Sequence, residues 1–278
     1  MFTLTKLNNE VIKPLPVYHP RPDQILGYNI ILLLYSNIFV CGRKGSGKTN
    51  VINHMIKKCI DKETKVIVFS ATHNSDANWL EIKKWLEERK QPAMFYLNIR
   101  EGKTSHIQDL VQVMQEEDEA EQAQNKIKKI KKDKKVEIIK FNDGSEEEST
   151  DTKLKIKIKK KVKTGPKYMF IFDDISAELK QKNVRVLLKH YKSKVIISSQ
   201  YPNDIDRAAR VQIDFWCLFK GFEPLKMEEV FPQLDIDGLD FEGFYRIYKN
   251  VTSTPHNFLY VDKGNNELRE NFDQKINL

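Results

Sequence analysis

The sequence predicts an α/β fold of three layers, in which helices cover both faces of a mainly parallel central sheet. Short apolar segments of strand length alternate with segments whose apolar residues recur at helical spacing, and several short segments end in polar or acidic residues. Such strand ends are typical of the edge where open α/β sheets bind ligands. The expected strands are residues 37–41, 65–70, 93–97, 168–172, 194–200, 215–219 and 258–261, and the expected helices are 51–58, 76–90, 105–135, 180–189 and 224–230.

A glycine-rich loop between the first expected strand and its helix carries the most specific pattern in the chain. Residues 42–49 read GRKGSGKT. The glycines let successive backbone N–H groups surround phosphate oxygens, and the helix that follows presents its positive end to the same anion. In such a P-loop, Lys48 would reach the β- and γ-phosphates of ATP, and the Thr49 hydroxyl would ligate Mg²⁺. The expected nucleotide-binding residues are Gly42, Arg43, Lys44, Gly45, Ser46, Gly47, Lys48, Thr49 and Asn50.

A second chemical pattern is the pair of acids, Asp173 and Asp174, at the end of the apolar strand 168–172. This arrangement matches the Walker B pattern, in which the first acid helps to hold Mg²⁺. Asp173 is therefore the expected metal ligand beside Thr49, and Asp174 is the expected general base for the attacking water. Acids end many strands, so the pattern becomes specific only through the P-loop in the same chain. Together the two patterns predict a P-loop NTPase of the ASCE type.

Three further side chains are candidates for catalysis. Gln200 would sense the γ-phosphate beside Asp173 from the same sheet edge, or it would merely cap its strand. Arg207 and Arg210 are candidates for an arginine finger, a guanidinium that stabilises charge on the phosphoryl group in a neighbouring subunit's site. Either arginine could instead pair with nearby acids on the surface.

All of the excess positive charge lies in one segment. Residues 126–163 contain 15 lysines and 7 acids, and the difference of +8 equals the net charge of the whole chain. We interpret residues 125–165 as an insertion, a helix capped by a β-hairpin with strands at 136–141 and 153–159. A basic finger of this kind could contact DNA phosphates, or it could be a solvated loop, because it lacks arginine and interleaved aromatic residues.

The remaining composition suggests a simple domain organisation. Residues 1–28 carry four prolines and are expected to form an extended arm, either loose or packed on a neighbouring subunit. An ATPase domain at 29–278, interrupted by the insertion, would follow. Three scattered cysteines favour a reducing setting and indicate no zinc site. The longest apolar run, residues 30–34, is too short to span a bilayer, so we expect neither a membrane segment nor a signal peptide.

The order of these patterns resembles that of the FtsK/HerA-type ATPases of viruses, the poxvirus-like genome-packaging ATPases also found in giant viruses, virophages and polinton elements. The resemblance spans roughly residues 36–262, apart from the insertion, which does not map onto the family. Asp174 stands where many relatives have glutamate, which leaves the identity of the catalytic base open. The matching residues are Gly42 to Thr49, Phe69 to Thr72, Asp76, Trp79, Phe170 to Asp174, Ser198 to Gln200, Arg210, Asp214, Phe215, Phe244 to Tyr248, Thr254 and Asn257 to Leu259.

The resemblance implies a ring of five or six identical subunits that pumps double-stranded DNA into a preformed viral capsid. Capsid proteins would be partners, and the host cytoplasm, a viral factory or the virion would be the location. It also favours Arg210 over Arg207 as the finger. One rival is another P-loop enzyme, although the chain has no Asn-Lys-x-Asp motif of GTPases and no arginine-rich lid of nucleotide kinases. A second rival is a DNA-binding module that uses nucleotide without motor activity.

Overall fold

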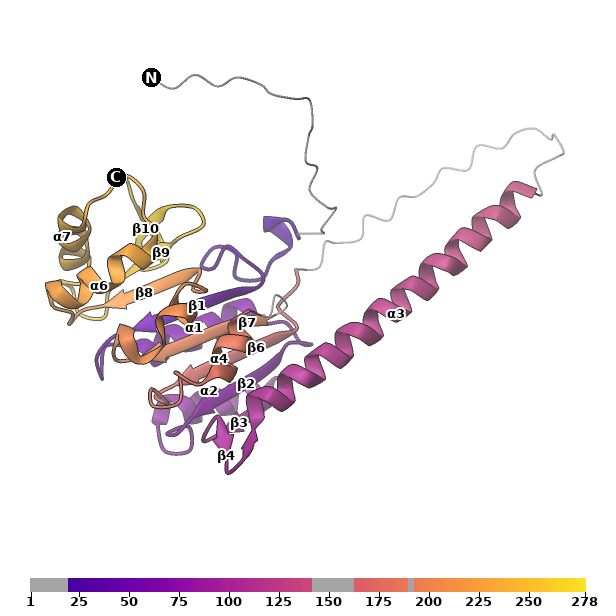
Figure 1. The fold of residues 1–278 in the computed structure, drawn as a ribbon, viewed down its shortest axis with the longest axis horizontal. Coiled ribbons are helices and arrows are strands. Elements are labelled where there is room, and N and C mark those ends of the chain that lie inside the picture. The colour runs from indigo at the N-terminus through magenta and orange to yellow at the C-terminus, as the bar shows by residue number, and fades with distance from the viewer. Residues whose placement is uncertain (1–19, 142–162, 190–192) are drawn as a thin grey trace, which may run out of the picture.

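The computed structural model describes residues 20–141, 163–189 and 193–278, and within them the main sheet has nine strands (Figure 1). The spatial order is β11-β10-β9-β8-β1-β7-β6-β2-β3, and the six strands from β8 to β3 run parallel. The predicted α/β fold is therefore confirmed. The strands of this sheet are β1 (Ser36–Cys41), β2 (Lys65–Ser70), β3 (Ala93–Tyr96), β6 (Tyr168–Asp173), β7 (Ser193–Ser199), β8 (Phe215–Phe219), β9 (Phe258–Asp262), β10 (Glu267–Glu270) and β11 (Gln274–Ile276).

Helices cover both faces of the sheet, because alternate residues of each central strand point to opposite sides. In β1, Ile38 and Val40 belong to the hydrophobic cluster formed with α1 and α2, whereas Phe39 belongs to the cluster formed with α3, α4, α6 and α7. This gives the three predicted layers. The helices are α1 (Lys48–Cys59), α2 (Ala77–Glu88), α3 (His106–Phe141), α4 (Lys182–Leu188), α5 (Arg207–Arg210), α6 (Pro224–Leu234) and α7 (Phe241–Val251).

The strand order brings the two sequence motifs to the same sheet edge. β7 lies between β1 and β6, and its Ser198 is in register with both Val40 and Asp173. Because the three strands are parallel, their carboxyl ends meet at one edge, where open α/β sheets bind ligands. The glycine-rich loop after β1 and the acids at the end of β6 therefore flank the end of β7.

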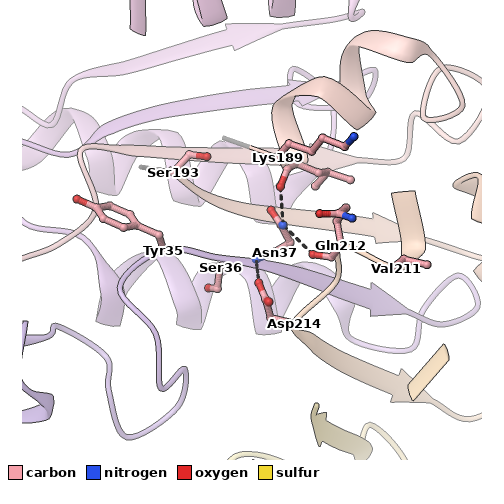
Figure 2. A pocket seen from close by; sticks show the side chains of 9 residues that line it. Tyr35, Ser36, Asn37, Lys189, Ser193, Val211, Gln212 and Asp214 are labelled. Carbon is pink, nitrogen blue, oxygen red and sulfur yellow. Dashed lines mark hydrogen bonds between the residues drawn. The ribbon is translucent and has the colours of Figure 1, made fainter. Parts of the chain in front are cut away.

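Asp214, one of the residues in the family resemblance, has a structural role at the opposite edge of the sheet. Its Oδ2 accepts a hydrogen bond of 2.7 Å from the backbone N–H of Asn37, and the Asn37 amide donates to the carbonyl oxygens of Leu188 and Gln212 (Figure 2). Burial raises the pKa of Asp214, while the Asn37 N–H opposes that shift. These bonds join the start of β1 to the segments before β7 and β8.

The long helix α3 leaves the body of the domain (Figure 1). It continues to Phe141, so the strand expected at 136–141 is wrong. No glycine or proline interrupts residues 106–141, so a helix that has already formed extends through the β-branched residues at its end. The strand expected at 153–159 lies outside the described residues. Where α3 crosses the sheet, Glu117 accepts hydrogen bonds from Lys65 (2.7 Å) and Tyr168 (2.6 Å), which anchor the helix to β2 and β6.

Some residues of the predicted arm and of the predicted insertion contact the rest of the ATPase domain. Within the arm predicted at 1–28, residues 1–19 lie outside the described part, but Ile25 is buried and the N–H of Leu26 donates to the carbonyl of Thr164 (3.1 Å). Thr164 itself belongs to the predicted insertion 125–165, and so does Gly165, whose N–H donates to the Asp61 carboxylate (2.7 Å). The ends of the arm and of the insertion thus pair with each other, and the insertion's end also contacts the turn between α1 and β2.

The tail contains more strands than the sequence suggests. β9 was expected to be the last strand, yet β10 and β11 follow it in an antiparallel arrangement, and a small hairpin of β4 (Arg100–Glu101) and β5 (Thr104–Ser105) precedes α3. These strands are short and mostly polar, so no apolar run marks them. In the described part of the chain, no helix has both the length and the apolar character needed to cross a bilayer.

Candidate active site

The loop between β1 and α1 has the geometry that phosphate binding requires. Gly45 and Gly47 adopt φ angles of 78° and 103°, in the left-handed region that favours glycine. A side chain at Gly42 would meet Phe219, whose Cβ would lie 2.6 Å from the added carbon. The buried Ser46 hydroxyl has no hydrogen-bond partner among the described residues. This oxygen lies on the Gly42 side of the loop, since a carbon added at Gly42 would meet it at 2.7 Å, and Ser46 does not line the pocket described below.

Lys48 begins α1 and turns its ammonium back across the loop. The side chain is 8% exposed, and Nζ donates to the carbonyl oxygens of Gly42 (2.8 Å) and Arg43 (3.2 Å). The charge therefore lies inside the ring of backbone groups, at the positive end of the helix. Both sources of positive potential favour an anion at the same point.

The side chain of Asp173, at the end of β6, is held by a residue from the helix α2. The indole Nε1 of Trp79, in α2, donates to its Oδ2 over 2.7 Å, and both side chains are buried. Burial raises the pKa of Asp173; hydrogen bonding to Ser198 and Trp79 lowers it, the nearby charge of Asp174 raises it, and that of Lys48 lowers it. The indole thus orients Oδ2 of a carboxylate that lines the pocket described below.

Two further carboxylates reach the same region. Asp174 is exposed and adopts a left-handed φ of 55°, a conformation that aspartate tolerates better than most residues. Asp76 caps the start of α2, where its carboxylate accepts hydrogen bonds from the N–H groups of Asn78 (2.9 Å) and Trp79 (3.2 Å). The Asp76 carboxylate is therefore engaged by its own helix, whereas Asp174 is the acid better placed to accept a proton.

These elements enclose a pocket of about 330 Å³. It joins the P-loop, the start of α2, the end of β6 and the turn before β9, and its oxygen ligands suit Mg²⁺, which prefers carboxylates, hydroxyls and phosphates. Thr49 and Asp173 both line it and could hold the ion together with a nucleotide's phosphates. The lining residues are Lys44, Gly45, Gly47, Lys48, Thr49, Asn50, Asp76, Asn78, Asp173, Asp174 and His256.

The other predicted catalytic residues lie outside this lining. Gln200 directly follows β7 and is half-buried. Arg210 is 9% exposed, and its Nη1 donates to the Pro202 carbonyl (3.3 Å) and to the Asn203 side chain, so its guanidinium is engaged within its own chain. Arg207 is exposed on the same short helix, α5. Exposure therefore favours Arg207 over the predicted Arg210 as a group that could reach a neighbour.

Two residues of the pocket appear neither among the predicted site residues nor in the family resemblance. Asn78 follows the cap of α2, and His256 comes from the turn before β9, more than 200 positions along the chain from the P-loop that it contacts. Its Nδ1 lies 3.2 Å from the carbonyl oxygen of Ser46. A lone histidine in a polar turn carries no local signal, and only the position of β9 beside β8 brings it to the pocket.

Comparisons with known proteins found likenesses of fold alone. No family model and no curated protein sequence matches the chain. The genome packaging NTPase B204 of Sulfolobus turreted icosahedral virus 2, in complex with AMP, matches 86% of this chain and 97% of its own, with 13% identity and a TM-score of 0.49. The DNA-packaging ATPase B204 of Sulfolobus turreted icosahedral virus matches 85% of this chain and 96% of its own, with 13% identity and a TM-score of 0.45.

A third solved structure that matches is EssC (ATPases 2 and 3) from Geobacillus thermodenitrificans, over 82% of this chain and 37% of its own, with 15% identity and a TM-score of 0.47. At such low identity and TM-score, function has to be inferred from the pocket of this chain.

Proposed function

We propose that the protein is an ATPase whose pocket at the carboxyl edge of the sheet binds and hydrolyses MgATP. The observation that carries the proposal is the meeting of the P-loop with Asp173 and Asp174 in one pocket, although these segments are separated by more than 120 residues. The left-handed glycines and the inward ammonium of Lys48 both fit a phosphate.

The pocket residues would contribute to hydrolysis in two ways, by stabilising negative charge and by accepting a proton. The P-loop amides and Lys48 would neutralise the charge that spreads over the transferring phosphoryl group. Thr49 and Asp173 would hold Mg²⁺, which would supply further positive charge to the phosphates. Asp174 would accept a proton from the attacking water. Its carboxylate is exposed in the pocket, whereas that of Asp76 is engaged by the first turn of α2.

We further propose that hydrolysis drives the movement of double-stranded DNA into a viral capsid by a ring of identical subunits, in the host cytoplasm or a viral factory. Support comes from the motif order and from the lysines carried by α3 and the residues after it. Arg207 is exposed on α5 and would complete a neighbour's site, while Gln200 would sense the γ-phosphate. Replacing the seven lysines of residues 126–135 by glutamine should flatten the dependence of duplex binding on log[salt].

The direct test is the rate of ATP hydrolysis with and without duplex DNA. We expect hydrolysis that requires Mg²⁺ and rises when duplex is added. Lys48→Ala should abolish it, whereas Lys57→Ala, a matched change on the same helix and outside the pocket, should not. Hydrolysis indifferent to DNA would favour another class of P-loop enzyme. Nucleotide binding without hydrolysis would favour a DNA-binding module without motor activity.

A further inference from the structure

His256 approaches the nucleotide pocket from the side opposite the acids. The sheet order places β9 beyond β8 on one side of β1, whereas β6, which ends in Asp173, lies on the other side, beyond β7. β9 is antiparallel to β8, and Phe258 pairs with Phe219, so the start of β9 lies at the same edge as the P-loop. His256, two residues before β9, therefore lines the pocket across the P-loop from the metal ligands.

The backbone holds His256 in an unusual conformation. Its φ is 67°, in the left-handed region that residues other than glycine adopt uncommonly, histidine more often than most. The turn is fixed on its far side by Asn271, which exchanges hydrogen bonds with Phe258 (3.0 and 3.2 Å) and donates to the Asn257 side chain (3.2 Å). Non-glycine residues held in this region cluster at functional sites, where surrounding contacts compensate the cost.

The contact at Nδ1 also fixes the chemistry of the other ring nitrogen. Nδ1 lies 3.2 Å from the Ser46 carbonyl oxygen, which can only accept, so Nδ1 must carry the hydrogen. In the neutral imidazole, Nε2 is then an acceptor. The side chain is exposed, and a carbon added at Gly47 would lie 3.5 Å from Nδ1, so the ring stands directly beside the loop that surrounds the phosphates.

The side of approach indicates which part of a nucleotide the ring meets. Asp173 and Asp174 lie toward β6, so the metal ion and the terminal phosphate are expected on that side of the loop. His256 lies on the other side, where the α-phosphate, ribose and base remain. An acceptor there matches the donors of a nucleoside, its ribose hydroxyls and base amino group.

We infer that His256 is a nucleotide-binding residue: Ser46 fixes the ring through Nδ1, and Nε2 accepts a hydrogen bond from the nucleoside half of the bound nucleotide. This inference rests on the proposed ATPase function and adds a residue to the same site. It makes His256 a determinant of affinity for ADP and ATP alike. It gives the residue no part in the cleavage of the terminal phosphate.

The test compares two variants by calorimetric titration with ADP and with a non-hydrolysable ATP analogue. His256→Asn keeps a donor in the position of Nδ1 and tolerates the left-handed backbone, whereas His256→Gly removes the ring and also suits that backbone. Both should raise the Kd for both nucleotides about five- to tenfold, the effect of one lost hydrogen bond. The kcat at saturating ATP should stay within about twofold of wild type. His54→Asn, an exposed histidine outside this pocket, is the matched control.

Four results would overturn the inference. Wild-type affinity in His256→Asn would show that Nε2 contacts no nucleotide and that the residue only positions the Ser46 carbonyl. A loss of affinity for the ATP analogue without a loss for ADP would place the contact at the terminal phosphate. Unchanged affinity in both variants would remove His256 from the site while leaving the ATPase proposal intact, whereas a wild-type protein that binds neither nucleotide would refute both.

Discussion

The indole nitrogen of Trp79 donates a hydrogen bond of 2.7 Å to Oδ2 of Asp173, and both side chains are buried. Trp79 belongs to α2, whose first turn is capped by Asp76, and Asp173 ends β6. The bond therefore couples the position of α2 to the orientation of the proposed metal ligand. Partners that orient a metal ligand in this way commonly change metal affinity or activity by 10- to 100-fold when they are removed.

Trp79→Phe should raise the Mg²⁺ concentration required for half-maximal ATP hydrolysis about tenfold or more, because the carboxylate loses the donor that orients it. Binding of nucleotide without Mg²⁺ should change little, since Trp79 does not line the pocket. Trp85→Phe, on the same helix and away from Asp173, is the control. An unchanged Mg²⁺ requirement in Trp79→Phe would mean that the indole has no part in holding the ligand.

Asp173→Asn should lower ATP hydrolysis roughly 10²-fold or more and yet raise the Tm of the nucleotide-free protein at pH 7. Burial raises the pKa of Asp173 in the folded state, so ionised Asp173 destabilises the fold above that pKa. The gain in Tm should shrink as the pH falls toward the pKa of the unfolded carboxyl group, because wild-type Asp173 is then protonated in both states. Thermal unfolding between pH 4 and 8 measures this. A Tm of Asp173→Asn below that of wild type at every pH in this range would contradict the claim that ionised Asp173 destabilises the fold.

The two arginines of α5 should behave differently. Arg210→Ala should lower stability by about 2 kcal/mol, since the buried guanidinium bonds to Pro202 and Asn203. Arg207→Ala should leave the Tm unchanged and lower turnover about 10³-fold if Arg207 is the finger. Mixing Arg207→Ala subunits with Asp174→Asn subunits should then restore part of the activity. Full activity in Arg207→Ala would return the role to Arg210, the residue favoured by the sequence.

Glu117 should make the anchoring of α3 dependent on pH. Burial alone would raise its pKa, but hydrogen bonds from Lys65, Tyr168 and Lys167 lower it to about 2. Its contribution to stability is therefore complete above the unfolded pKa of about 4.5 and is lost as the pH falls toward 2. Glu117→Gln should cost about 1 kcal/mol at pH 7 and nothing near pH 2, as measured by denaturant unfolding. Glu121→Gln, whose carboxylate lies 4.0 Å from Lys167, should have no effect at either pH.

The features that could be anticipated from the sequence are those that a short, contiguous stretch of residues specifies. The P-loop and the two acids are contiguous patterns, and parallel strands bring their ends together, so the pocket could be anticipated without coordinates. His256 and the bond between Trp79 and Asp173 depend on which strands and helices become neighbours, and no short pattern records this. The engagement of Arg210 is different, because its partners Pro202 and Asn203 belong to the turn just before α5; these contacts are local in sequence, yet no short pattern records them.

The most direct test of the account is a structure of the protein determined with millimolar AMPPCP and Mg²⁺. The account predicts a triphosphate wrapped by the backbone N–H groups of residues 42–49, with Lys48 on its β- and γ-phosphates and a metal ion between Thr49 and Asp173. A pocket without nucleotide under these conditions, or a nucleotide bound elsewhere on the chain, would contradict it.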